Sequence, residues 1–264
     1  MKIKSVVKVM NFHSLLKVDK ARKTAEKYFE YEEGLTDFAD NIMNNRNLIL
    51  DKKVLKLNTK EKPLNIYIGN DLGFCGNFNT NVNKSAKEDL NSEKIIIGKK
   101  ILGGKNNVLL AMTKEEYLNN TSKIEKIIYD KVKKAQISEI NLIYNHYYNI
   151  SKIELVKKKI LPLDNKLGKK GHKEDFVIEG DINNILLNII VLYLSYEIRI
   201  ATENSYASEN VARQMLTKES LRKIDEIEEE NLRIERKEKN AKGFKKVIEN
   251  FIKLKDKEGK RWKV

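Results

Sequence analysis

One glycine-rich turn has residue types and a position that could serve phosphate chemistry. It runs from Gly69 to Asn79 with the sequence GNDLGFCGNFN, directly after the apolar run LNIYI and before a helical pattern. Such a turn can hold a phosphate on the backbone N–H groups of the helix N-terminus. However, it contains neither G-x-G-x-x-G nor G-x-x-x-x-G-K-[ST], and no lysine follows it to neutralise a phosphate. The pattern favours a structural turn, with a nucleotide-dependent enzyme as the alternative.

The residues that could act as a nucleophile or a metal ligand are few and scattered. Cys75 is the only cysteine, which excludes an intramolecular disulfide and a cysteine-based zinc site. The three histidines, His13, His146 and His172, lie in separate segments, so Cys75 has no evident base. We expect a buried, inert thiol and, around His146, a packed aromatic cluster with neighbouring tyrosines. No metal-ligand spacing is present, and we predict no catalytic residue, cofactor or metal.

The charge balance indicates an anionic partner without identifying it. Lys and Arg number 52 against 38 Asp and Glu, a net charge of +14. Such a balance suits nucleic acid, an anionic membrane surface or an acidic protein. Near the C-terminus an acidic run, residues 225–230, precedes a basic run from Arg233 to Lys246. This charge-segregated helix is either a solvated face or a basic shaft end that acidic partner surfaces recognise.

Helix-breaking residues are concentrated in the middle of the chain. Nine of the 12 glycines lie between Gly69 and Gly180, whereas the two ends contain few. At both ends apolar residues recur at spacings of three, four or seven, which predicts helices from Ile3 to about Arg46 and from Asn184 to about Lys255. These helices would be roughly 65 and 105 Å long. Because so narrow a stripe needs a second helix beside it, we predict an antiparallel coiled coil of the two ends.

The middle segment alternates between strand-like and helical patterns, which predicts an inserted small Rossmann-like α/β domain. We therefore expect an α/β fold with three parts: an N-terminal coiled-coil helix in residues 1–60, an α/β base domain with a loop in residues 61–182, and a C-terminal coiled-coil helix in residues 183–264. The expected loop spans residues 164–181. The expected strands are Leu64–Ile68, Lys94–Ile97, Val108–Ala111, Glu139–Tyr144 and Ile153–Leu161, and the expected helices are Asn79–Leu90 and Lys114–Ala135.

No segment of the sequence predicts membrane insertion or secretion. No apolar run approaches the ~18 residues that a membrane-spanning helix needs. The first residues, MKIKSVVKVMNFHS, lack the apolar core of a signal peptide. We therefore expect a cytoplasmic protein that reaches a membrane only through its partners.

Three stretches match the motifs of one protein family. Residues 71–79, DLGFCGNFN, resemble the signature D-R-G-L-C-G-x-F-N of the gamma subunit of F-type ATP synthases, with Leu72 in place of the usual Arg. Residues 203–215, ENSYASENVARQM, resemble the E-x-x-x-S-E-x-x-A-R-M-x-A-M region of its C-terminal helix. Ile3 and Ser5-Val6 also resemble the family's opening I-x-S-V. The matching positions that we single out as structural are Asp71, Gly73, Cys75, Gly76, Asn79, Ser208, Glu209, Ala212, Arg213 and Met215.

This resemblance implies a mechanical function. In the family the terminal helices form the rotor shaft inside a head of alpha and beta subunits, and the α/β domain forms the base. Gamma couples ATP turnover to rotation and contributes no catalytic residue. The implied partners are alpha and beta subunits of a hexameric head, with an epsilon-like subunit and a membrane rotor ring as further candidates, and no nucleic acid. The residues that we expect to contact the head are Arg233, Arg236, Lys239, Asn240, Lys242, Lys17 and Lys20.

The C-terminal end departs from the family pattern. Residues 237–244 match the family's K-x-R-Q-A-x-I-T only loosely, and the charged tail of residues 255–264 replaces a small, apolar end. The departure allows one alternative to a proton-coupled ATP synthase shaft, and the net positive charge allows a second. One is the gamma-like shaft of a paralogous F-type-like ATPase not coupled to a proton ring. The other, from a different functional class, is a basic coiled coil that binds nucleic acid.

Overall fold

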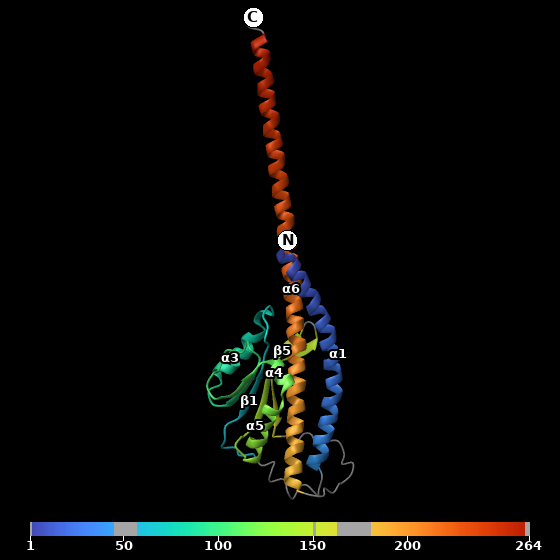
Figure 1. The fold of residues 1–264 in the computed structure, drawn as a ribbon, viewed down its shortest axis with the longest axis vertical. Helices are drawn as coiled ribbons and strands as arrows, with labels where there is room; N and C mark the ends of the chain where they lie inside the picture. Colours follow the sequence, from blue (N-terminus) through green and yellow to red (C-terminus); the bar gives the residue numbers. More distant parts are fainter. Residues whose placement is uncertain (1, 45–56, 150–151, 163–180, 262–264) are drawn as a thin grey trace. The chain divides into compact units, whose positions relative to one another are not determined.

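Two long helices dominate the fold. The structure, a computed structural model, describes residues 2–44, 57–149, 152–162 and 181–261. Helix α1 (Lys2–Asn44) and helix α6 (Ile182–Arg261) confirm the two predicted terminal helices (Figure 1). By internal contacts the chain divides into two compact units, Met10–Leu216 and Met1–Val9 together with Thr217–Val264. Both helices take part in both units.

The middle of the chain forms one five-stranded sheet, and every predicted strand is present. The strands are β1 (Leu64–Ile68), β2 (Glu93–Ile97), β3 (Val108–Met112), β4 (Ile140–Asn149) and β5 (Lys152–Leu161). Their order is β3-β2-β1-β4-β5. Strands β1 to β4 are parallel, and β5 pairs antiparallel with β4. This arrangement confirms the α/β class with a Rossmann-like insert.

Short helices connect the strands. After β1 come the 3-10 turn η2 (Gly76–Asn79) and helix α3 (Thr80–Glu88). The prediction of one helix over Lys114–Ala135 is wrong, because the segment forms α4 (Lys114–Asn119) and α5 (Ser122–Lys133). Asn120 leaves the helical region with φ −150° and ends α4. Asn, Thr and Ser side chains compete for backbone hydrogen bonds, so the sequence N-N-T-S at residues 119–122 favours this break.

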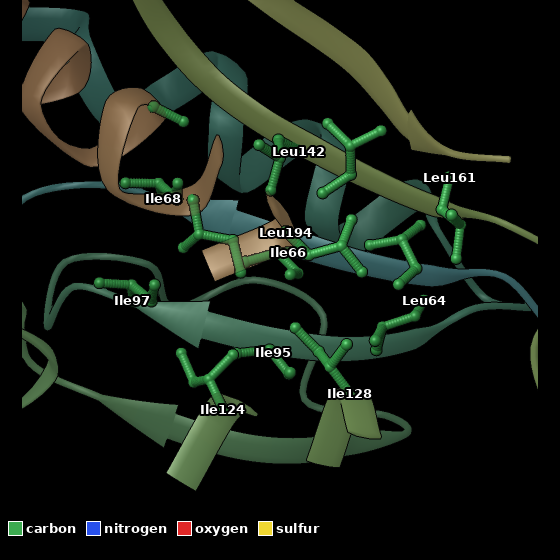
Figure 2. Packing of buried hydrophobic residues seen from close by; sticks show 14 of the residues in the cluster. Leu64, Ile66, Ile68, Ile95, Ile97, Ile124, Ile128, Leu142, Leu161 and Leu194 are labelled. Carbon is green, nitrogen blue, oxygen red and sulfur yellow. The ribbon is translucent and has the colours of Figure 1, made fainter. Parts of the chain in front are cut away.

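The main core lies between one face of the sheet and helices α5 and α6. Alternate strand residues such as Ile66, Ile95 and Leu142 point to this face and meet Ile128 of α5 and Leu194 of α6 (Figure 2). All five are fully buried. Each such side chain stabilises the fold by about 1.5–3 kcal/mol relative to exposure.

A smaller cluster covers part of the other face. Val82 and Ala86 of α3 pack with Tyr67, Ile96 and Ile143, which come from β1, β2 and β4. The sheet therefore has helices on both faces, as in doubly wound α/β folds.

Helices α1 and α6 contact each other as antiparallel partners. In the larger unit, Asn11 Nδ2 donates to the Gln214 carbonyl at 3.2 Å. In the smaller unit, Lys4 Nζ lies 2.7 Å from Asp225 Oδ1 and also bonds Glu228. The predicted apolar stripe of α6 is buried over its first half, at Leu187, Ile190, Leu194, Ile198, Ala201, Ser205 and Ser208.

The second half of that stripe is exposed, which corrects the expectation that pairing with the N-terminal helix covers it. Ile227, Ile234, Ile248 and Phe251 are each at least 44% exposed. The reason is the length of α1, which begins at Lys2. Lys4, only two residues further along, is the residue that pairs with Asp225 and Glu228. No described residue of α1 is left to cover the rest of α6.

Some predictions fall outside the described residues. The expected loop over residues 164–181 lies there apart from Asp181, and so do the side chains of the charged tail, residues 255–264. The division into residues 1–60, 61–182 and 183–264 stays a prediction. Over the described ranges, no helix combines the length and apolar character that crossing a membrane requires.

Candidate functional site

The signature turn after β1 is fixed to neighbouring loops by the carboxylate of Asp71. Asp71 Oδ1 accepts a hydrogen bond from Lys99 N at 2.8 Å, and Oδ2 accepts one from Lys114 N at 3.0 Å. Lys99 follows β2 and Lys114 follows β3, whereas Asp71 itself follows β1. The Asp71 side chain therefore connects the carboxyl ends of three parallel strands. Asp71 thus has a structural partner for each of its oxygens.

Inside the turn, two asparagines surround the cysteine. Asn70 Nδ2 donates to Cys75 Sγ at 2.6 Å, Asn79 Nδ2 donates to Asn70 Oδ1, and Asn70 N donates to Asn79 Oδ1 at 3.4 Å. Cys75 is buried, as predicted. Burial raises the pKa of the Cys75 thiol, although Asn70 opposes the shift. The thiol is therefore kept neutral, which is unfavourable for a nucleophile.

The backbone of the turn adopts conformations that few residues accept. Gly76 has φ +56°, and a Cβ at this position would lie 3.0 Å from Leu216 Cδ1 of α6. Phe74 has φ +60° although it carries a side chain, which is 74% exposed. For a residue with a Cβ, this region costs about 1–2 kcal/mol. The surrounding contacts must therefore hold the turn in this shape.

Arg213 of α6 supplies several of those contacts. Its Nε and Nη2 both donate to the Gly73 carbonyl at 3.2 Å. Its Nη2 also pairs with Glu209, and its Nη1 donates to Asn210 Oδ1 at 3.2 Å. Burial raises the pKa of Glu209, while the Arg213 guanidinium opposes the shift. The guanidinium thus clamps the turn to the long helix.

Two further contacts join the insert to α6. Ser208 Oγ lies 3.1 Å from the Asn145 carbonyl of β4 and 2.9 Å from the Asn204 carbonyl. Lys114 Nζ lies 3.4 Å from the centroid of the Tyr206 ring, a cation–π contact. Burial lowers the pKa of Lys114 to about 8, although Glu203, Glu209 and Asp71 act to raise it.

The structure brings most of the predicted signature residues together at this junction. Asp71, Gly73, Cys75, Gly76 and Asn79 lie in the turn. From α6, Arg213 contacts the turn, Glu209 pairs with Arg213, and Ser208 contacts β4. Ala212 is half-buried, whereas Met215 is 49% exposed.

Sequence reasoning missed Lys114, Tyr206, Asn70 and Asn145. The partners of Lys114 and Asn145 are far away in sequence, so local spacing carries no signal for them. Only Asn70, beside Asp71 in the turn, belongs to a pattern typical of local side-chain hydrogen bonds.

The two backbone N–H groups that open the turn are bonded to the chain itself. Gly69 N donates to the Ile97 carbonyl at 2.8 Å, and Asn70 N is bonded to Asn79. A Cβ on Gly69 would lie 2.7 Å from Ile101 Cγ1, so this side of the turn is filled. The geometry favours the structural role over the nucleotide-dependent enzyme.

The other chemical candidates also have packing partners. The His146 ring lies edge-on to Tyr144 and Tyr148, with centroids 5.8 and 4.5 Å apart, which confirms the aromatic cluster. Within the part of the chain that the structure describes, no three His, Cys, Asp or Glu side chains form a group that could hold a metal ion.

The residues expected to contact a head lie on the surfaces of the two long helices. Lys17 and Lys20 on α1 are exposed. Arg233, Arg236, Lys239, Asn240 and Lys242 on α6 are exposed as well. Arg233 also lines a shallow cavity of about 420 Å³ together with Glu226, Glu229, Glu230, Ile234 and Lys237.

Comparison with known proteins identifies the family. A family model described as ATP synthase matches residues 1–240. The ATP synthase gamma chain of Clostridium perfringens is 28% identical over 236 residues, covering 85% of this chain and 82% of that one. The gamma chain of Mycoplasma mobile is 26% identical over 242 residues, with 85% of each chain covered.

A solved structure shares the fold. The Tetrahymena thermophila mitochondrial ATP synthase structure of the central stalk and c-ring contains a chain with a TM-score of 0.62 at 18% identity, covering 81% of this chain and 99% of that chain. Because the family model extends over nearly the whole sequence and the signature turn is docked on the long helix, the chain belongs to the ATP synthase gamma-chain family.

Proposed function

We propose that the chain is the central rotor shaft of an F-type rotary ATPase and couples ATP turnover in an alpha/beta head to rotation. The observation that carries the proposal is the part of α6 beyond its pairing with α1. This part continues from Glu228 to Arg261 as an uninterrupted helix.

The free part of α6 carries an apolar stripe open to solvent. Its exposed large apolar residues are Leu232, Ile234, Phe244, Val247, Ile248, Phe251 and Ile252. The last five recur at spacings of three and four, which places them on one face of the helix. A contiguous exposed apolar face of this kind is typical of a binding surface. A sleeve formed by the head subunits would cover it.

The basic residues beside this stripe suit the same partner. Arg233, Arg236, Lys239 and Lys242 recur every three residues and wind gradually around the helix. Acidic surfaces on successive head subunits could therefore each meet a different member of the set. Presenting a different side to each subunit in turn would shift that subunit between conformations, provided its contacts differ between them.

The insert would act as the base of the rotor. Arg213, Ser208 and Lys114 tie the sheet and its turn to α6, so a force on the insert would be passed to the helix. Besides alpha and beta subunits, we assign an epsilon-like subunit and a membrane rotor ring as partners at this end. The chain would contribute no catalytic residue and would sit at the cytoplasmic face of the membrane through these partners.

The paralogous motor is the second candidate. The charged tail, residues 255–264, and Leu72 in place of the usual Arg both depart from the family pattern. Purification would separate the two candidates, since a complex that holds a membrane ring supports the ATP synthase and a complex in which another assembly occupies that end supports the paralogue.

The test of the shaft is co-expression of the chain with the ATPase subunits encoded beside it. Native mass spectrometry should find one copy of the chain with a hexameric head. A chain that stays alone, or binds nucleic acid in place of the head, would contradict the proposal.

A further inference from the structure

Strand β3 is an edge of the sheet, and its last three residues, Leu110 to Met112, carry little protection against pairing with another chain. It has the sequence VLLAM and one ladder partner, β2. Edge strands expose backbone N–H and C=O groups that can pair with another chain, and proteins usually guard them with charges, proline or bulges that twist the edge away. The β2–β3 ladder has one register shift: Val108 pairs with Lys94 and Leu110 pairs with Ile95, so Leu109 of β3 is a bulged residue. Beyond it, Leu110 to Met112 pair regularly and contain no charge and no proline. The bulged residue, Leu109, is 40% exposed.

The face of the sheet beside this edge is also uncovered. Helix α3 covers Tyr67, Ile96 and Ile143, but its cluster reaches β3 only at Val108. A groove of about 380 Å³ lies between β3 and the loop that follows β2. Its apolar lining residues are Ile96, Ile101, Leu102, Val108, Ala111 and Met112. Leu102 is 72% exposed on the loop.

The wall of the groove is preformed. Asn83 Oδ1 accepts from Leu102 N at 2.7 Å and from Gly103 N at 3.0 Å, and Asn83 Nδ2 donates to the Lys100 carbonyl at 3.0 Å. A Cβ on Gly103 would lie 2.4 Å from the Asn83 carbonyl oxygen. The loop is therefore packed tightly on α3, and a ligand would not have to order it.

The charges at the groove select the kind of occupant. Lys99 and Lys105 line it, and both are exposed. The one acid there, Glu116, already accepts from Thr113 N at 2.7 Å in the capping box of α4. A second copy of this chain would bring the same lysines and a net charge of +14. An acidic partner is favoured because opposite charges steer association and like charges oppose it.

We propose that β3 and this groove receive an extended, acidic segment of another subunit of the ATPase complex. The segment adds a strand to the free edge of β3, inserts apolar side chains between Ala111 and Leu102, and places carboxylates beside Lys99 and Lys105. Main-chain pairing gives affinity in this mode, and the pockets for alternate side chains give specificity. The inference rests on the proposed function for the source of the segment.

The experiment compares hydrogen–deuterium exchange of the full chain alone with that of the chain in the co-expressed complex. The outward-facing amides of β3 should exchange at least about tenfold more slowly in the complex, since a paired edge must open before it exchanges. Unchanged exchange at β3 in an assembled complex overturns the inference and leaves the proposed function intact. A complex that never assembles contradicts the proposed function, and the inference falls with it.

Two variants locate the contact. Leu109→Lys places a charge on the edge, and Lys99→Glu combined with Lys105→Glu reverses the rim. Each of these two variants should lower by about tenfold the fraction of complexes that retain the subunit bound at β3. The loss caused by the double lysine change should become smaller in high salt. Leu90→Lys, at an exposed apolar residue elsewhere in the insert, is the matched control. Equal retention by all three variants, or protection of β3 that depends on the concentration of the free chain, overturns the proposal.

Discussion

Arg213 Nε and Nη2 each lie 3.2 Å from the carbonyl oxygen of Gly73, although 140 residues separate the two in sequence. The contact fixes a turn of the α/β insert to the long helix. It also explains how two separate family stretches act together, because each supplies one half of a single junction.

Replacing Arg213 by alanine should destabilise the chain by about 3 kcal/mol, since breaking a buried ion pair leaves a partner charge uncompensated. Equilibrium unfolding in urea measures the change. Arg222→Ala is the control, because Arg222 pairs with Glu226 on an exposed surface of the same helix. That loss should stay below about 1 kcal/mol. Equal losses of unfolding free energy in the two variants would show that the buried contacts of Arg213 stabilise the chain no more than an exposed ion pair does.

Two glycine-to-alanine substitutions should change the stability of the chain in opposite directions. Gly76 has φ +56° and little room beside Leu216, so Gly76→Ala should destabilise by about 1–2 kcal/mol. Gly243 lies in α6 with open space around its Cβ position, so Gly243→Ala should raise the stability of the helix there by up to about 1 kcal/mol. Circular dichroism during thermal unfolding measures both, and a stable Gly76→Ala protein would contradict the strained turn.

Much of the fold could be predicted from the sequence because it depends on local pattern. Continuous apolar runs marked the strands, and the scarcity of glycine and proline marked the two long helices. The break at Asn120 was missed because the apolar period of Ile124, Ile128 and Val132 in α5 continues that of Tyr117 in α4. The exposed end of α6 was missed for another reason, since periodicity shows that a stripe needs a partner without showing which element supplies it.

The site was predicted less completely, for a physical reason. Resemblance gave Asp71 and Arg213, but the contacts of these residues join positions far apart in sequence. The position of Lys114 over the Tyr206 ring depends on how α4 packs against α6. The spacing of residues along the sequence does not encode that packing.

Lys114 should make stability depend on alkaline pH. Burial lowers its pKa from 10.5 to about 8 in the folded chain. Between these pH values the unfolded state binds more protons than the folded state, so stability should rise with pH in that window. Lys114→Met should remove the rise, and Lys126→Met, at an exposed lysine of α5, should keep it. Urea unfolding at several pH values from 7 to 11 measures the slope, and identical slopes in all three proteins would contradict the burial of the Lys114 charge.

Charge reversal on the free part of α6 should impair coupling while leaving the fold intact. The change replaces Arg233, Arg236, Lys239 and Lys242 by Glu. Acidic head surfaces would then repel the helix, and ATP-driven rotation should fall by about tenfold or more. Helix content by circular dichroism should stay unchanged, because these residues are exposed.

The matched control reverses four exposed lysines of the insert, Lys84, Lys87, Lys123 and Lys126. This protein has the same net charge as the α6 variant, so it separates a local contact from a general charge effect. Normal rotation by the α6 variant would mean that its basic face is only solvated.

Single-molecule rotation tests the shaft most directly. The natural thiol, Cys75, is buried, so a bead can be attached through Lys126→Cys on the surface of α5. With the head fixed to glass and ATP supplied, the bead should turn in one direction and stop when ATP is removed. A head that contains the chain and hydrolyses ATP while the bead stays still would contradict the rotor shaft.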